Sequence, residues 1–235
     1  MQTQKKISLI LFVMLGIFFM ISTGCKKKTD PVPEPVTVKD IDGNVYHLVT
    51  INSQVWMVEN LKTTKYRNGD AIPAVTIDSL WNKQAATSTG AYCNYNINGA
   101  SIAVYGHLYN WYAVNDPRGL APAGWHIASK TEWEALTTFL GGDTLAGGKL
   151  KETGTLNWLS PNTGATNSTG FTAVPGGFRI YSGKSEMFGA FGVWWTSTPA
   201  DDFSALNCGM FNDNAGALIS ANRKANGCSI RCIRD

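Results

Sequence analysis

Residues 129–141 read SKTEWEALTTFLG and carry the clearest structural signal in the chain. Ser129 and Glu132 have the spacing of a capping box, in which each side chain accepts a hydrogen bond from the other's backbone N–H. Trp133, Leu136 and Leu140 follow at helical spacing and predict one buried face. The glycine that closes the segment easily adopts the left-handed conformation that ends many helices. The stretch therefore predicts a short amphipathic helix packed on a core.

Around this helix the pattern is one of short strands and turns. Asp42-Gly43 is a tight-turn dipeptide between two apolar runs, so it predicts a β-hairpin. Residues 62–90 and 157–170 are polar and aperiodic and predict loops. Further short helices are predicted over 105–114 and 145–151. Strands are predicted over 36–39, 45–51, 55–60, 171–179, 189–197, 205–211, 216–221 and 228–234. We expect an α+β domain with a mostly antiparallel sheet, two or three short helices and long loops.

The first 35 residues have the features of an export and anchoring segment. Residues 1–24 combine two lysines, an apolar stretch and small residues directly before Cys25, which is typical of a lipoprotein signal peptide. Ordinary cleavage and an uncleaved anchor are the alternatives. Residues 25–35 would form a lipid-anchored, proline-rich stalk, and residues 36–235 the globular domain. We expect the protein in the cell envelope, tethered to the outer membrane on its periplasmic or surface face.

Composition limits the classes of partner. The chain has a net charge of +3 and only 16% charged residues, and loss of Lys5 and Lys6 with the signal would leave +1. Such a balance gives no electrostatic basis for binding nucleic acid. Eight Trp, eight Tyr and ten Phe beside 24 Gly are typical of many short strands and tight turns.

Four cysteines follow Cys25, and an even number in an exported chain favours disulfides. Cys228 and Cys232 would lie on one predicted strand about 13 Å apart, too far for a bridge. Two pairings remain, and of these we favour Cys208–Cys228 across neighbouring strands, with Cys93–Cys232 joining the first half of the domain to its end.

The aromatic residues divide into two groups. Those in patterned elements are expected in the core: Trp56, Trp111, Trp125, Trp133 and Trp195. Those in loop-like stretches are candidates for an exposed ligand-binding patch: Trp81, Trp158, Tyr181 and Phe188.

Oxygen-rich turns offer a candidate calcium site, formed by Asp201, Asp202, Asn212, Asp213 and Asn214. Such residues are also what turns require, and no other cofactor is expected. The three histidines, His47, His107 and His126, are scattered without metal-ligand spacing. No Gly-x-Ser-x-Gly elbow is present, so no catalytic residue is predicted.

Several stretches together resemble a known family. They are QVWMVENL (54–61), YGHLYNWYAV (105–114), GWHIASKTEW (124–133), GGKLKE (147–152), FTAVPGGFR (171–179), WWTST (194–198) and SIRCIRD (229–235). In this order they resemble the Fibrobacter succinogenes major paralogous domain family of cell-envelope lipoproteins. That resemblance implies a domain of unsettled biochemical function.

More distantly, the TEWE helix and the RCIR end strand are similar to the C-type-lectin-like fold shared with formylglycine-generating enzymes. The resemblance implies such a fold here, although the paired thiols of those enzymes have no match. Ala121 departs from the family, which usually has a Cys before Pro-x-Gly-Trp. A Cys208–Cys228 bridge would replace the lost one.

These observations favour a non-enzymatic, lipid-tethered module that binds a glycan or protein partner through its loops. An architectural or adhesive envelope component and an enzyme with an unrecognised site are the alternatives. Asp78-Ser79-Leu80 and Asp143-Thr144-Leu145 also resemble a short O-glycosylation sequon, although both pairs are common in turns and caps.

Overall fold

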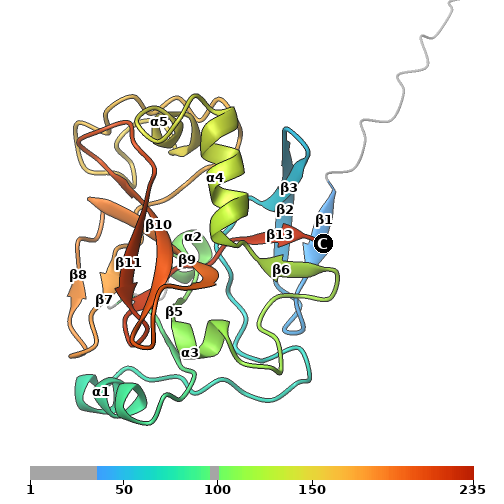
Figure 1. Cartoon of the computed structure of the whole chain (residues 1–235), viewed down its shortest axis with the longest axis vertical. Coiled ribbons are helices and arrows are strands. Elements are labelled where there is room, and N and C mark those ends of the chain that lie inside the picture. The colour runs from blue at the N-terminus through green and yellow to red at the C-terminus, as the bar shows by residue number, and fades with distance from the viewer. Residues whose placement is uncertain (1–35, 96–100) are drawn as a thin grey trace, which may run out of the picture. The chain divides into compact units, whose positions relative to one another are not determined.

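The computed structural model describes residues 36–95 and 101–235, and within them five short helices and thirteen short strands (Figure 1). The expected signal segment, Cys25 and the stalk lie outside the described residues. The helices are α1 (Asp78–Ala86), α2 (Ser101–Tyr105), α3 (Trp111–Val114), α4 (Lys130–Phe139) and α5 (Ala146–Leu150). None of these described helices has the length and apolar character needed to cross a membrane.

The strands form three sheets, and every pair of named strands is antiparallel. The first has the order β1 (Thr37–Lys39), β2 (Val45–Ile51), β3 (Gln54–Met57), β13 (Cys232–Arg234), β6 (Trp125–Ile127). The second has the order β11 (Leu218–Arg223), β10 (Ser204–Phe211), β9 (Phe191–Pro199). The third has the order β4 (Tyr92–Cys93), β5 (Leu108–Asn110), β12 (Gly227–Cys228), β7 (Phe178–Arg179), β8 (Ser185–Glu186). The expected α+β class with mostly antiparallel strands is confirmed.

Helix α4 has the features that its sequence predicts. The Ser129 backbone N–H donates to Glu132 Oε2 at 2.7 Å, and the Glu132 N–H donates back to Ser129 Oγ at 3.3 Å. Trp133, Leu136 and Leu140 are all buried, and Gly141 has a φ of +99°. The capping box therefore fixes where the helix begins, and the buried face fixes its orientation on the core.

Other elements differ from expectation where burial overrides the local pattern. Helix α1 forms inside the polar stretch 62–90, because Trp81 is buried and anchors it. Residues 105–114 divide into β5 and α3, joined at Asn110, whose side chain accepts a hydrogen bond from the Ala113 N–H. Of the predicted strand 171–179, only β7 pairs as a strand.

The predicted strand 228–234 also divides, into β12 and β13, which belong to different sheets. Between them Ser229 forms a parallel bridge to Trp194 of β9. The side chains of Ser229 and Arg231, which read as the exposed face of an alternating strand, are buried. The end of the chain therefore passes through the interior rather than along one sheet.

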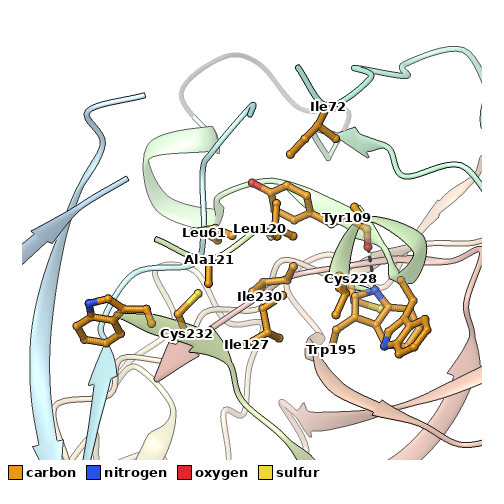
Figure 2. Packing of buried hydrophobic residues seen from close by; sticks show 14 of the residues in the cluster. Leu61, Ile72, Tyr109, Leu120, Ala121, Ile127, Trp195, Cys228, Ile230 and Cys232 are labelled. Atoms are coloured by element: carbon orange, nitrogen blue, oxygen red, sulfur yellow. Dashed lines mark hydrogen bonds between the residues drawn. The ribbon is translucent and has the colours of Figure 1, made fainter. Parts of the chain in front are cut away.

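Two large apolar clusters fill the space between the sheets. In the first, Trp195 of β9 lies against β5 and donates from Nε1 to the Tyr109 carbonyl at 2.8 Å (Figure 2). In the second, Trp56, Trp133 and Phe171 pack with ring centroids 4.9–5.7 Å apart. All five tryptophans expected in the core are buried, which confirms that prediction.

Candidate functional site

Residues of α1, α3 and the β9–β10 turn line an open groove with aromatic walls. These three elements lie at the same end of the domain (Figure 1). The groove has a volume of about 530 Å³. We call it the aromatic groove, and its lining residues are Asn82, Ala85, Ala86, Tyr112, Tyr181, Phe203, Ser204, Arg223 and Ala225. They come from α1, α3, the ends of β10 and β11, and three turns, so the site depends on long-range packing.

Two aromatic side chains of the groove are strongly exposed. Phe203, in the turn between β9 and β10, is 81% exposed, and Tyr181, in the turn between β7 and β8, is 41% exposed. The Arg223 guanidinium lies over the Tyr181 ring, 4.7 Å from its centroid. An exposed aromatic ring forgoes the free energy that its burial would provide. Exposed rings that are held in place are therefore typical of binding surfaces.

Backbone hydrogen bonds fix the turn that carries Phe203. The Asp201 carboxylate accepts from the N–H groups of Phe203 and Ser204, both at 2.7 Å, and these bonds lower the pKa of Asp201. The Lys224 N–H donates to the Phe203 carbonyl at 2.9 Å. Phe203 is therefore presented by a braced turn, which reduces the entropy lost on binding.

The Asn226 side chain links the turn that carries Tyr181 to the end of β11, where Arg223 lies. Its Oδ1 accepts from the Tyr181 N–H at 2.7 Å, and its Nδ2 donates to Asn222 Oδ1 at 2.6 Å. Asn226 is buried, so solvent does not compete strongly for these bonds.

Trp81 supports the helical wall rather than binding a ligand, which corrects its expected exposure. Its side chain is 1% exposed, and the Arg179 guanidinium stacks 4.7 Å from its ring. Arg179 also donates to the Val75 and Thr76 carbonyls and to Asp78 Oδ1, which ties the start of α1 to β7.

The other aromatic candidates lie outside the groove. Trp158 is buried, against expectation, and donates from Nε1 to the Ala173 carbonyl at 2.8 Å. Phe188 is partly buried between Tyr95 and Tyr105, with ring centroids 4.7 and 4.8 Å away. Of the four candidates, only Tyr181 lines the groove.

The five residues of the candidate calcium site are not brought together. Asp201 and Asp202 precede β10 while Asn212, Asp213 and Asn214 follow it, so the two groups lie at opposite ends of an eight-residue strand. Such a strand is about 25 Å long. Within residues 36–95 and 101–235 no three His, Cys, Asp or Glu side chains form a potential metal site.

A lysine takes the position that a cation would have at the 212–214 turn. Lys151 is fully buried, and its Nζ donates to the carbonyls of Thr163, Phe211 and Asn214 at 3.0, 2.9 and 2.8 Å. Burial lowers its pKa to about 8, so the ammonium group is still mainly charged at pH 7. The chain's own ammonium group therefore satisfies the Phe211 and Asn214 carbonyls at this turn.

The expected disulfides are also wrong, because Cys93, Cys208, Cys228 and Cys232 are all free and buried. Cys208 and Cys228 belong to different core clusters, and Cys93 and Cys232 to different sheets. Burial raises the pKa of Cys93 to about 11 and that of Cys232 to about 12. Protonated, buried thiols are poor nucleophiles.

The expected replacement of a family bridge at position 121 by Cys208–Cys228 is therefore wrong. In Figure 2 the Ala121 side chain instead points toward Cys232, and both belong to the same cluster.

The three histidines lie in separate places. His107 is buried, and its Nδ1–H donates to Asn94 Oδ1 at 2.6 Å. Burial lowers the pKa of His107 to about 4. His126 bonds Glu132 and Asp235, each at 2.7 Å, beside the start of α4. His47 pairs with Glu59 at 2.6 Å. None of them lines the aromatic groove.

Sequence reasoning missed most of the groove. Phe203 did leave a signal, since a large apolar residue in the Asp-Asp-Phe-Ser turn between two predicted strands is unexpected. No local sequence pattern indicates Tyr112, Asn82 or Arg223, because only long-range packing brings these residues together.

Comparison with protein families found one match. Residues 49–234 match the Fibrobacter succinogenes major domain. The comparisons with curated proteins and with solved structures gave no match.

Proposed function

Because the chain belongs to the Fibrobacter succinogenes major domain family, and membership assigns no activity by itself, we propose a function from the groove: it is a non-catalytic saccharide-binding module of the cell envelope. The observation that carries the proposal is the braced, open groove with Tyr112, Tyr181 and Phe203 on its walls. Aromatic faces pack against the apolar faces of sugar rings, while nearby polar groups bond their hydroxyls.

The size and chemistry of the groove favour a saccharide over a protein partner. Its volume of about 530 Å³ falls within the roughly 300–1,000 Å³ of small-molecule sites. The Asn82 amide and the Ser204 hydroxyl add hydrogen-bonding groups beside the rings.

The lining of the groove also supports binding rather than catalysis. The described residues that line it include no carboxylate, imidazole or thiol. Hydrolysis of a glycosidic bond ordinarily uses a pair of carboxyl groups. Asp201, in the turn that carries Phe203, already accepts two backbone hydrogen bonds.

The proposal places the module on the outer membrane, tethered by lipid at Cys25 with residues 25–35 as a stalk. The apolar segment before Cys25 and the prolines after it support this location. We also assign the antiparallel α+β domain to the C-type-lectin-like folds, on the resemblance of the TEWE helix and the RCIR strand. Metabolic labelling with a fatty acid tests the anchor: Cys25→Ser should abolish label and release the protein from membranes.

A glycan array tests the binding function. The probe is the mature chain carrying Cys25→Ser, so that no lipid interferes. Saturable binding is expected, and Phe203→Ala and Tyr181→Ala should each weaken it about tenfold, since one aromatic contact is worth roughly 0.5–1.5 kcal/mol beyond its buried area.

Phe139→Ala is the matched control. Phe139 is 56% exposed on α4, outside the groove, so its loss should leave the affinity unchanged. Folded protein that binds no saccharide on the array would overturn the proposal and favour the architectural role.

A further inference from the structure

Arg223 is the charged side chain among the described residues that line the aromatic groove. It is exposed, and within the described residues no carboxylate forms an ion pair with it. By contrast, Arg118 and Arg179 are paired with aspartates. A guanidinium held in a binding groove without an internal partner is available to a ligand.

The Tyr181 ring restricts the orientation of this guanidinium. The Arg223 Cζ atom lies 4.7 Å from the ring centroid, which is within cation–π range. A guanidinium packed on a ring by its face keeps its N–H edges free. Those edges match the two oxygens of a carboxylate, which Arg binds in a bidentate manner.

The backbone on both sides of Arg223 is held in place. Lys224 donates from its backbone N–H to the Phe203 carbonyl at 2.9 Å, and its Nζ donates to the Asp202 carbonyl at 3.1 Å. Its ammonium group also lies 4.8 Å from the Trp111 ring centroid. Arg223 also pairs with Ser204 across β10 and β11, so Arg223 and Phe203 are held next to each other at the groove.

Charge and shape together narrow the class of ligand. We propose that the aromatic groove binds acidic saccharides, with the sugar rings against Tyr181 and Phe203 and the carboxylate of a uronic acid on Arg223. This inference rests on the proposed function, since it names the substrate class of the same site. A neutral saccharide can pack against the rings, but it has no charged group for the Arg223 guanidinium, which then stays hydrated.

Isothermal titration calorimetry of the mature Cys25→Ser chain tests the inference. The probes are short oligomers of galacturonic acid and of glucuronic acid, each compared with its methyl ester. The ester keeps the sugar and removes the charge. A charge-assisted bidentate contact should make at least one of the acids bind about ten- to a hundredfold more tightly than its ester. Raising NaCl from 0.1 to 0.5 M should reduce that difference.

Variants assign the effect to Arg223. Arg223→Met should bring acid and ester to equal affinity while leaving the ester's affinity within about twofold. Arg234→Met is the matched control, because Arg234 is also exposed and stacks on a tryptophan, 5.3 Å from the Trp125 centroid, outside the groove. It should preserve the preference. Unchanged urea midpoints would show that both variants fold.

The outcomes separate this inference from the function on which it rests. Equal affinity for acid and ester, or a preference that survives in Arg223→Met, would overturn the acidic-saccharide inference alone. Binding to neutral saccharides on the array, without binding to either uronic acid oligomer, would also overturn the acidic-saccharide inference alone. Failure to bind any saccharide would overturn both.

Discussion

At the scale of single residues, Lys151 shows how a charge can be buried without a carboxylate. Its ammonium group donates to three backbone carbonyls, one at Thr163 and two at the end of β10 and the following turn, at 2.8–3.0 Å. Lys151→Met should lower the free energy of unfolding by roughly 2–4 kcal/mol, because the carbonyls lose a charged donor and stay buried. Urea unfolding at pH 7 measures the loss. Lys149→Met, at an exposed position of α5, should change the free energy of unfolding by less than about 0.5 kcal/mol.

His126 gives the domain a pH-dependent contribution to stability. Burial alone would lower its pKa, but hydrogen bonds to Asp235 and Glu132 outweigh burial and raise the pKa above its ordinary 6.5. Its contribution is therefore complete below pH 6.5 and lost as pH rises through the raised pKa. For Glu132, burial is outweighed by hydrogen bonds from Ser129 and His126, which lower its pKa below 4.5. Its contribution is lost as pH falls.

The pair should therefore stabilise the domain most between about pH 4.5 and 6.5. His126→Gln should cost about 0.5–1 kcal/mol at pH 6 and less at pH 9, as for a partly exposed ion pair. Urea unfolding of both proteins at the two pH values measures this. An equal cost at both values would mean that His126 acts through packing alone.

At the scale of elements, the sequence predicts what local interactions determine. Helix α4 was predictable because its cap, buried face and terminal glycine all lie within residues 129–141. The split between β12 and β13 was not, because the acceptors of Arg231 come from Met57, Asn60 and residues 171–172. The groove follows the same rule. Tyr181 was predicted from its loop position, but Tyr112 and Arg223 are 111 residues apart in the sequence.

The placement of Ala121 beside Cys232 in one core cluster predicts that a disulfide can be introduced there. Ala121 and Cys232 are 4% and 0% exposed, and their side chains point toward each other (Figure 2). Ala121→Cys should form a bridge with Cys232 under oxidising conditions and stabilise the domain by up to about 4 kcal/mol, since it closes a loop of roughly a hundred residues. A mass decrease of two hydrogens and a thiol count one below that of the original chain measure the bridge. Ala123→Cys, at an exposed position nearby, should instead stay reactive toward thiol reagents.

At the scale of the whole molecule, the segment from β12 to β13 joins all three sheets. Cys228 pairs with Tyr109 in one sheet, Ser229 bridges to Trp194 in the second, and Ile233 pairs with Trp56 in the third. Because one continuous segment contributes to each sheet, loss of any sheet disturbs the other two. The domain should therefore unfold in a single cooperative transition.

Arg231 tests this coupling, because it lies at the centre of that segment. Its guanidinium is fully buried and donates to Asn60 Oδ1 and to the carbonyls of Met57, Phe171 and Thr172. Arg231→Met should cost roughly 3–5 kcal/mol, since four buried acceptors lose a charged donor. In urea, tryptophan fluorescence and far-UV circular dichroism should move together to a lower midpoint. Two separated transitions in the variant would show that the sheets are stable independently and that the terminal segment does not couple them.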